Sequence, residues 1–275
     1  MAEPAFQRCD ISHQGLGVPV SYFIRPGRAG TLIYLHGLGA SKGDFLEAAR
    51  HQGLRDYTLL AFDFPGFGET PYPAECHWSM GDLVQVTDLL TVALNLTDPV
   101  IVGHSLGGLV GLMYALRYPG KVKGLVSIEG NLAPEDCFLT RAAARQSFPE
   151  FAGSRHLENL KLKFATAPDK GTSRWAAGLE RGSLQAFYNY SISAVDLSDN
   201  GELLGIFCDL PIPKMFVYGS ANNHLSYLTR LRQSDASVVE VPGSGHWPQV
   251  ENPGYFYRAL GGFLSERDPW SIIEP

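Results

Sequence analysis

Short apolar runs alternate with segments of helical periodicity along most of this chain of 275 residues. Runs that are apolar throughout are typical of parallel strands covered by helices on both faces. The alternation therefore predicts an α/β protein whose strands are joined by right-handed crossovers. We expect six such strands, at Thr31–Leu35, Tyr57–Phe62, Val100–Val102, Val122–Ile128, Lys214–Tyr218 and Ser237–Val241.

The N-terminal region predicts two further strands. Val18–Arg25 has the pattern of an antiparallel strand, and we expect it to pair with Phe6–Ser12. Another helix follows the glycine-rich turn after Val102 and runs to Tyr118. The other helices of the sheet region are expected at Lys42–Gln52, Met80–Leu94 and Pro253–Leu264.

The rhythm of strands and helices breaks between Leu132 and Leu210. This segment is too long for one crossover helix and too apolar and aromatic for a linker. It predicts a mostly helical insertion at the C-terminal edge of the sheet. The expected organisation is thus a core, residues 1–131 and 211–275, and a helical cap insertion, residues 132–210.

Composition narrows the class of protein. Hydrophobic residues make up 45% of the chain, which is enough apolar surface for a packed core and excludes whole-chain disorder. The formal net charge of −6 argues against nucleic acid as a partner and against a polybasic membrane anchor. The four cysteines show no metal-binding spacing. Residues 1–10 lack a signal-peptide pattern, so a cytoplasmic location is expected.

One motif carries most of the chemical information. Gly103–Gly108 reads GHSLGG, matches the pattern G-x-S-x-G, follows an apolar run and precedes a helical segment. The tight turn needs tiny residues on both sides of the serine, and it aims the hydroxyl at a pocket. The N–H of Leu106 and the helix dipole can then face a developing oxyanion. The uncharged stretch Pro99–Leu116 therefore predicts a strand, a turn and a buried helix rather than a membrane span.

Three other segments, two before this motif and one after it, also match patterns of a known family. They are His36–Gly39, Asp63–Gly68 and Gly243–Pro248, the last followed by Glu251–Pro253. Together with the serine motif they resemble the α/β-hydrolase fold family over nearly the whole chain. The resemblance implies a mostly parallel eight-stranded α/β-hydrolase sheet with helices on both faces and a helical cap.

The resemblance also implies a set of site residues. Ser105 would be the nucleophile, His246 the general base, and the backbone N–H groups of Leu38 and Leu106 the oxyanion hole. Chemistry favours the same pair, because a serine hydroxyl is a poor nucleophile unless an imidazole accepts its proton. Of the eight histidines, His246 alone follows the last predicted strand within a Gly/Ser turn.

Two more histidines, His36 and His104, belong to the motif turns. We expect them to hold loops rather than to transfer protons.

The third member of the triad departs from the family pattern. The family usually places an acid where Asn222 stands, and an amide carries no charge to stabilise an imidazolium. Glu129 follows the strand next to the one that carries Ser105, and Gly130 permits a sharp turn that would aim it at His246. We therefore predict Glu129 as the acid. The alternatives are Asn222, Asp199 and Asp209.

These residues predict a serine hydrolase that cleaves an ester, lactone or thioester through an acyl-enzyme on Ser105. Neither a metal nor an organic cofactor is expected. The aromatic residues of the insertion favour a small-molecule acyl substrate with apolar or aromatic character, and they fit equally well as the insertion's own core. The sequence indicates no oligomeric state.

Three other functions stay open. A C–C bond hydrolase would use the same triad, and a non-catalytic ligand-binding relative would fit the amide at Asn222. The glycines at 37, 39 and 43, with Asp63 closing the next strand, also resemble a dinucleotide-binding βαβ unit, although the third glycine is one position late. That pattern would make the protein an NAD(P)-binding oxidoreductase.

Overall fold

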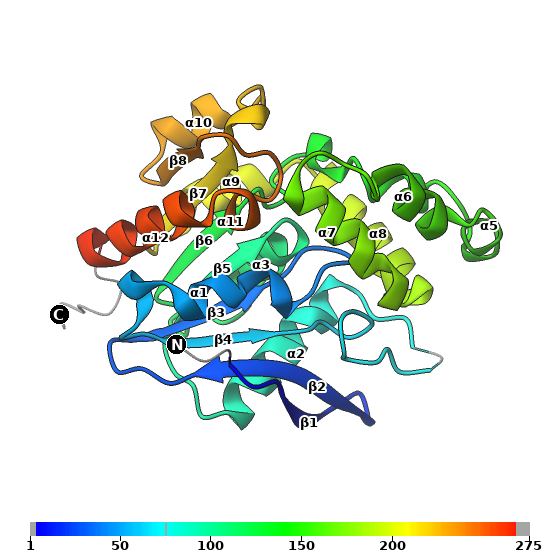
Figure 1. Ribbon diagram of the computed structural model, residues 1–275, viewed down its shortest axis with the longest axis horizontal. Coiled ribbons are helices and arrows are strands. Elements are labelled where there is room, and N and C mark those ends of the chain that lie inside the picture. Colours follow the sequence, from blue (N-terminus) through cyan, green and yellow to red (C-terminus); the bar gives the residue numbers. More distant parts are fainter. Residues whose placement is uncertain (1–3, 75, 268–275) are drawn as a thin grey trace.

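The computed structural model describes residues 4–74 and 76–267. These residues form an eight-stranded sheet with strand order β1-β2-β4-β3-β5-β6-β7-β8 (Figure 1). Within it β2 is antiparallel to both of its neighbours, β1 and β4, and the pairs from β4 to β8 are all parallel. The strands are β1 Gln7–His13, β2 Leu16–Arg25, β3 Thr31–Leu35, β4 Thr58–Phe62, β5 Pro99–His104, β6 Gly124–Ile128, β7 Lys214–Gly219 and β8 Ser237–Val241. The predicted fold class is confirmed.

The predicted N-terminal strand pair is a hairpin. His13 pairs with Leu16, so Gln14 and Gly15 form its turn. Both have positive φ, +53° and +77°, which is the geometry that matches the right-handed twist of the two strands. The predicted pairing of the first two strands is therefore correct.

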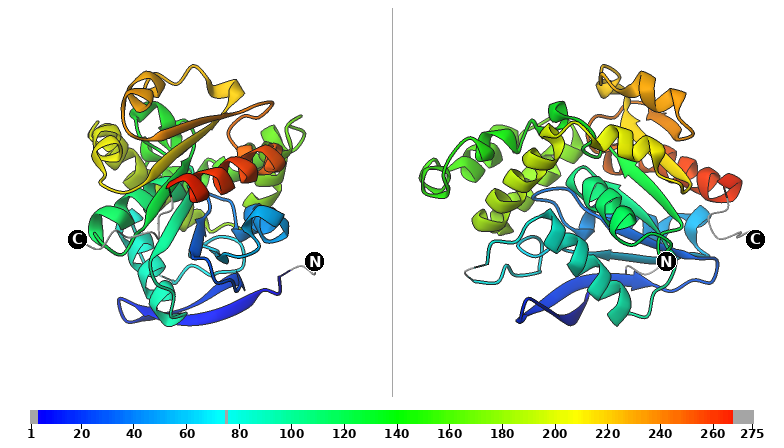
Figure 2. Two further views of the ribbon diagram at one scale, coloured as in Figure 1. Left: turned by 90° about the vertical axis from the view of Figure 1, so that its left-hand side faces the viewer. Right: turned by 180° about the vertical axis from the view of Figure 1, so that it is seen from behind.

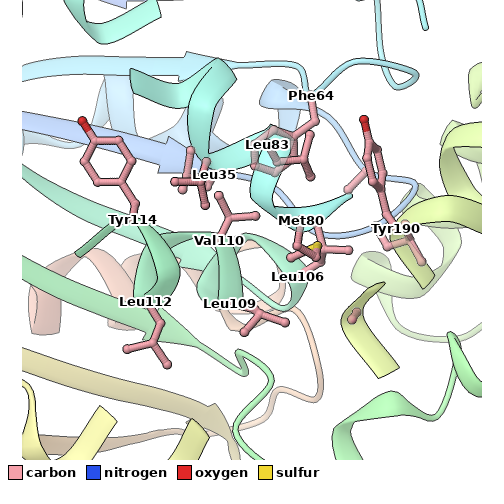
Figure 3. Packing of buried hydrophobic residues seen from close by; sticks show 14 of the residues in the cluster. Leu35, Phe64, Met80, Leu83, Leu106, Leu109, Val110, Leu112, Tyr114 and Tyr190 are labelled. Carbon is pink, nitrogen blue, oxygen red and sulfur yellow. The ribbon is translucent and has the colours of Figure 1, made fainter. Parts of the chain in front are cut away.

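Helices cover both faces of the sheet, and alternate residues of each strand face opposite layers. Ile33 and Leu35 of β3 belong to the same core cluster as residues of α2 and α3, whereas Leu32 and Tyr34 belong to a second cluster with residues of α1 and α12. Figure 2 shows the two layers on either side of the sheet, and Figure 3 shows the first of them. The helices of these layers are α1 Leu46–Arg50, α2 Met80–Ala93, α3 Leu106–Arg117, α10 Leu228–Gln233, α11 Pro248–Glu251 and α12 Pro253–Arg267.

The helix predicted at Lys42–Gln52 is broken. A 3₁₀ turn at Lys42–Phe45 precedes α1, and a second 3₁₀ turn follows at Gln52–Leu54. The backbone N–H of Lys42 donates to Asp63 Oδ1 at 2.7 Å, which ties the first turn to the loop after β4. This tertiary contact and the poor helix propensity of Gly43 account for the 3₁₀ geometry of the first turn.

The chain between β6 and β7 is mostly helical and contains no strand among its described residues. Most of its helices lie together at one end of the sheet (Figure 1, right-hand side), whereas the last of them lies beside β7. They are α4 Arg141–Ala144, α5 Phe148–Gly153, α6 His156–Phe164, α7 Lys170–Gly178, α8 Leu184–Asp199 and α9 Leu203–Asp209, with 3₁₀ turns at Pro134–Cys137 and Leu179–Arg181. The division into a core and a cap at residues 132 and 210 stays a prediction.

Among the described residues, no helix combines the length and the apolar character needed to cross a bilayer.

Candidate active site

Ser105 sits on a strained turn between β5 and α3. Its φ and ψ are +52° and −120°, and its N–H donates to the carbonyl of Ile128 at 2.8 Å. A Cβ added at Gly103 would lie 2.2 Å from the carbonyl oxygen of Gly107, and one added at Gly107 would lie 2.2 Å from that of Leu35. The two flanking glycines are therefore a steric requirement of this turn, as the sequence motif predicts.

Glu129 and His246 meet beyond the C-terminal ends of β6 and β8, two strands that flank β7. Glu129 Oε2 lies 3.1 Å from His246 Nδ1. Glu129 comes directly after β6, has φ +47°, and is only 6% exposed. Its N–H donates to the carbonyl of Val217 at 2.8 Å, so the backbone that aims this carboxylate is fixed to β7.

Asn222 contacts the same carboxylate. Its side-chain nitrogen lies 3.0 Å from Oε1 and 2.8 Å from Oε2 of Glu129, and the N–H of Gly219 donates to Oε1 at 2.8 Å. The amide at the family's usual acid position is therefore a hydrogen-bond donor to Glu129. Sequence reasoning missed this role, because it weighed Asn222 and Glu129 only as rivals.

The other acid candidates lie elsewhere. Asp199 forms an ion pair with Arg141, with 2.7 Å between Oδ1 and Nη2, and Asp209 ends α9. Among the described residues, neither is a hydrogen-bond partner of His246.

Ser105 and His246 line one small hollow. Leu38, Leu106 and Gly37 also line it, and its volume is about 20 Å³, roughly the room for one water molecule. Within residues 4–74 and 76–267, no hydrogen bond joins the Ser105 hydroxyl to His246. Catalytic hydrogen bonds are often long before substrate binds, so this geometry is compatible with proton transfer in a complex.

Both motif histidines hold loops. His36 Nε2 accepts the N–H of Phe64 at 2.8 Å, while its Nδ1 donates to the carbonyl of Gly37 at 2.7 Å. His104 Nε2 donates to the backbone carbonyl of His246 at 2.7 Å. Burial lowers the pKa of both imidazoles, so they act as neutral supports at physiological pH.

A larger cavity of about 610 Å³ also borders His246. The two cavities share six lining residues, Asp136, Phe138, Leu139, Trp175, His246 and Trp247, and therefore adjoin each other. Among the described residues that line it, none is a lysine or an arginine. Its carboxylates are Glu129, Glu135, Asp136, Asp169 and Glu251. These residues are scattered along the sequence, and apart from Glu129 sequence reasoning assigned none of them to a site.

Two of these carboxyl groups have a pKa above the usual range. Burial raises the pKa of Asp136 to about 6, and burial together with the neighbouring Asp169 raises that of Glu251. Glu251 Oε2 also accepts the N–H of Gly245 at 2.5 Å, next to His246. Across the part of the chain that the structure describes, no three His, Cys, Asp or Glu side chains are grouped to hold a metal ion.

The dinucleotide-binding alternative depended on Asp63. This residue is fully buried, and its carboxylate accepts the Lys42 N–H, the Lys42 ammonium at 2.7 Å and the Glu69 N–H at 2.8 Å. Both oxygens are thus engaged within the protein. The pattern of glycines and Asp63 does not form a ribose-binding site.

A family model matches most of the sequence. The sequence model described as "Alpha/beta hydrolase family" matches residues 32–259. The chain belongs to this family. The match includes the Ser105 turn, Glu129 and His246.

Individual relatives in the family are distant. Over 115 residues the chain is 37% identical to a pimeloyl-[acyl-carrier protein] methyl ester esterase of Shewanella woodyi. That stretch is 42% of this chain and 40% of the relative, so the chain spans less than half the length of this relative. Over 256 residues it is 24% identical to a 2-succinyl-6-hydroxy-2,4-cyclohexadiene-1-carboxylate synthase of Enterobacter sp., covering 88% and 95% of the two chains.

Solved structures agree on the fold of the family. A carboxylesterase structure from Nitrososphaera gargenis superposes with a TM-score of 0.77 at 19% identity, covering 94% of this chain and 99% of that chain. The N-acyl homoserine lactonase AidH, complexed with N-butanoyl homoserine, gives a TM-score of 0.75 at 19% identity, covering 98% and 99%.

Proposed function

We propose that this protein hydrolyses carboxylic ester-type bonds through an acyl-enzyme on Ser105. His246 is the general base and Glu129 the triad acid. The observation that carries the proposal is the 3.1 Å contact between Glu129 Oε2 and His246 Nδ1, beside a hollow that His246 shares with Ser105.

The steps follow from these positions. His246 Nε2 takes the hydroxyl proton as Ser105 attacks the acyl carbon, and the charge of Glu129 stabilises the imidazolium that forms. The N–H groups of Leu38 and Leu106 stabilise the oxyanion. His246 then gives its proton to the leaving alcohol, and a water molecule that it activates releases the acid. These steps need neither a metal nor an organic cofactor.

Ester, lactone and thioester substrates are all compatible with this chemistry. Relatives are named as a methyl ester esterase and a carbamate hydrolase, and fold neighbours as a lactonase and carboxylesterases. The carboxylates of the larger cavity favour uncharged or cationic small molecules over anions. Phe138, Phe164 and Trp175 in its wall favour apolar or aromatic groups.

The ligand-binding alternative depended on an amide in place of the triad acid. Because Asn222 donates to Glu129, the amide is compatible with an intact triad. This contact favours the enzyme over the binding relative.

A fluorophosphonate probe tests the proposal. It should label the wild-type protein but not Ser105→Ala or His246→Ala. A hydrolysis screen across short esters, aryl esters, lactones and acyl thioesters should then give turnover that Ser105→Ala abolishes. Absence of both labelling and turnover in a folded protein would reject the enzyme and favour a binding role.

A further inference from the structure

Helix α7 contacts the Leu38 loop, residues Gly37–Ala40, through a buried hydrogen bond. Trp175 Nε1 donates to the carbonyl of Leu38 at 2.8 Å, across 137 positions of sequence. Trp175 is 4% exposed and Leu38 is 6% exposed. A buried carbonyl that loses its donor is costly, so this contact constrains the loop.

The Leu38 loop is held on its other side by the core. The carbonyl of Gly37 accepts from His36 Nδ1 at 2.7 Å and from the N–H of Ala40 at 3.1 Å. In a trans peptide the C=O and the following N–H point in opposite directions. The direction of the Leu38 N–H, the proposed oxyanion donor, therefore depends on both contacts to the Gly37 carbonyl, the one from His36 and the one from Ala40.

Trp175 fixes the next peptide group, between Leu38 and Gly39. Gly39 has φ +73°, and a glycine lets this peptide rotate at little steric cost. Without the indole N–H, this peptide could rotate and move the Ala40 N–H away from the Gly37 carbonyl, which would weaken the hold on the Leu38 N–H. The conformation of Leu38 thus depends on a residue of a helix remote in sequence.

Further contacts hold α7 against the turn at Gly43 and Asp44 and against the loop that carries His246. Arg174 donates to the carbonyl of Gly43 at 2.5 Å and pairs with Asp44 at 3.1 Å. At the other end of α7, a Cβ added at Gly171 would lie 2.5 Å from Trp247 Cβ, so the helix packs tightly against the loop that carries His246. Figure 1 shows α7 beside α11, which begins at the end of that loop.

We propose that Trp175 is a positioning residue that sets the Leu38 N–H for oxyanion binding when α7 is seated. The inference rests on the proposed function. The packing of α7 against the Leu38 loop thereby affects the rate of the chemical step and not only the binding of substrate.

Trp175→Phe tests this coupling, because it keeps an aromatic ring next to Phe164 and Trp247 while it removes the N–H together with part of the indole. We expect kcat for an ester found in the screen to fall at least tenfold, with KM within about twofold, since loss of a whole oxyanion donor costs about 10²–10³ in kcat. Affinity for an arylboronic acid, which places a charged oxygen in the hole, should fall by the same factor as kcat/KM.

Trp78→Phe is the matched control. Trp78 is 1% exposed, and its indole donates to Gln14 Oε1 at 3.2 Å, at the hairpin turn between β1 and β2. The same substitution there removes a comparable hydrogen bond away from the site. It should lower the melting temperature and leave kcat unchanged.

Gly39→Ala perturbs the hydrogen bond between Trp175 and Leu38 from the side of the loop. Its Cβ would lie 3.0 Å from Trp175 Nε1 and 2.7 Å from Leu179 Cδ2. If Trp175→Phe does not fold, this variant should show the same selective loss of kcat and boronate affinity.

Two outcomes separate the inference from the function. Unchanged kcat in Trp175→Phe, or a loss that Trp78→Phe reproduces, would overturn the role of Trp175. A wild-type protein without serine-dependent hydrolysis would overturn the proposed function instead.

Discussion

The side-chain nitrogen of Asn222 lies within hydrogen-bond distance of both carboxylate oxygens of Glu129, at 3.0 and 2.8 Å. Glu129 in turn contacts His246 Nδ1 through Oε2. The carboxylate thus follows β6, and an amide stands after β7 at Asn222, where the resemblance to the family implies an acid. The pair retains one negative charge next to the proposed base.

This arrangement predicts unequal effects of the two residues. Glu129→Gln should lower kcat/KM by about 10⁴, because no charge then stabilises the imidazolium. Asn222→Ala should cost only about tenfold to a hundredfold, because it removes hydrogen bonds to a carboxylate that remains. In the double variant Glu129→Gln/Asn222→Asp, activity should partly return, since the pair again carries one carboxylate and one amide. Steady-state kinetics on one ester would decide, and equal losses in both single variants would contradict the assignment.

The charge of the larger cavity predicts selection among substrates. An ester with a trimethylammonium group on its alcohol should have a kcat/KM about tenfold higher than its uncharged 3,3-dimethylbutyl isostere. An ester with a carboxylate at the same place should be slower than both. The ratios should shrink in 0.5 M salt, about five times the ionic strength at which the screening length is 10 Å. Equal rates for all three esters would show that the cavity does not select charge.

Glu135→Gln provides a check on that selection. Glu135 lines the larger cavity, and its exposed carboxylate contacts Ser226 rather than His246. This substitution should reduce the preference for the cationic ester, whereas Asp10→Asn, on the exposed part of β1, should leave it unchanged.

The two glycines that flank Ser105 allow a steric prediction. Gly103→Ala or Gly107→Ala places a Cβ 2.2 Å from a backbone carbonyl oxygen, so the turn must move. We expect at least 2–3 kcal/mol of destabilisation, about the cost of overpacking a rigid core, and loss of fluorophosphonate labelling. Gly261→Ala in α12, where nothing lies within 4 Å of the added Cβ, should instead stabilise by about 0.5–1 kcal/mol. Chemical denaturation of the three variants tests both signs, and normal labelling of Gly103→Ala would show that the turn tolerates a side chain.

Asp44 predicts a pH dependence of stability. Burial raises its pKa from 3.8 to about 6, and the neighbouring Arg174 opposes that shift. A carboxyl group whose folded-state pKa is raised favours folding below the unfolded pKa near 4, and this contribution is lost as the pH rises through 6. The free energy of unfolding of Asp44→Asn minus that of the wild type should therefore increase by about 2–3 kcal/mol from pH 4 to pH 7. Urea titrations at several pH values measure this difference, and a flat difference would contradict the shift.

Local sequence patterns were sufficient to predict the sheet and the serine turn. Apolar runs such as Thr31–Leu35 can be buried only between two helical layers, and Gly103 and Gly107 are required by contacts of the turn itself. Such features depend on contacts within a few residues or on the burial of a whole segment. The local sequence pattern is sufficient to predict either of them. The helix predicted at Lys42–Gln52 is an α-helix only at Leu46–Arg50, and its first turn is a 3₁₀ turn tied to Asp63, which the local pattern does not contain.

The way in which the site residues divide their tasks depends on the folded chain. Glu129 and His246 are 117 positions apart, Asn222 is 93 positions from Glu129, and Trp175 is 137 positions from Leu38. Which oxygen meets which nitrogen depends on strand order, register and loop direction, and a difference of a few ångströms exchanges one partner for another. The same packing places five carboxylates around one cavity, although these acidic residues come from separate parts of the sequence.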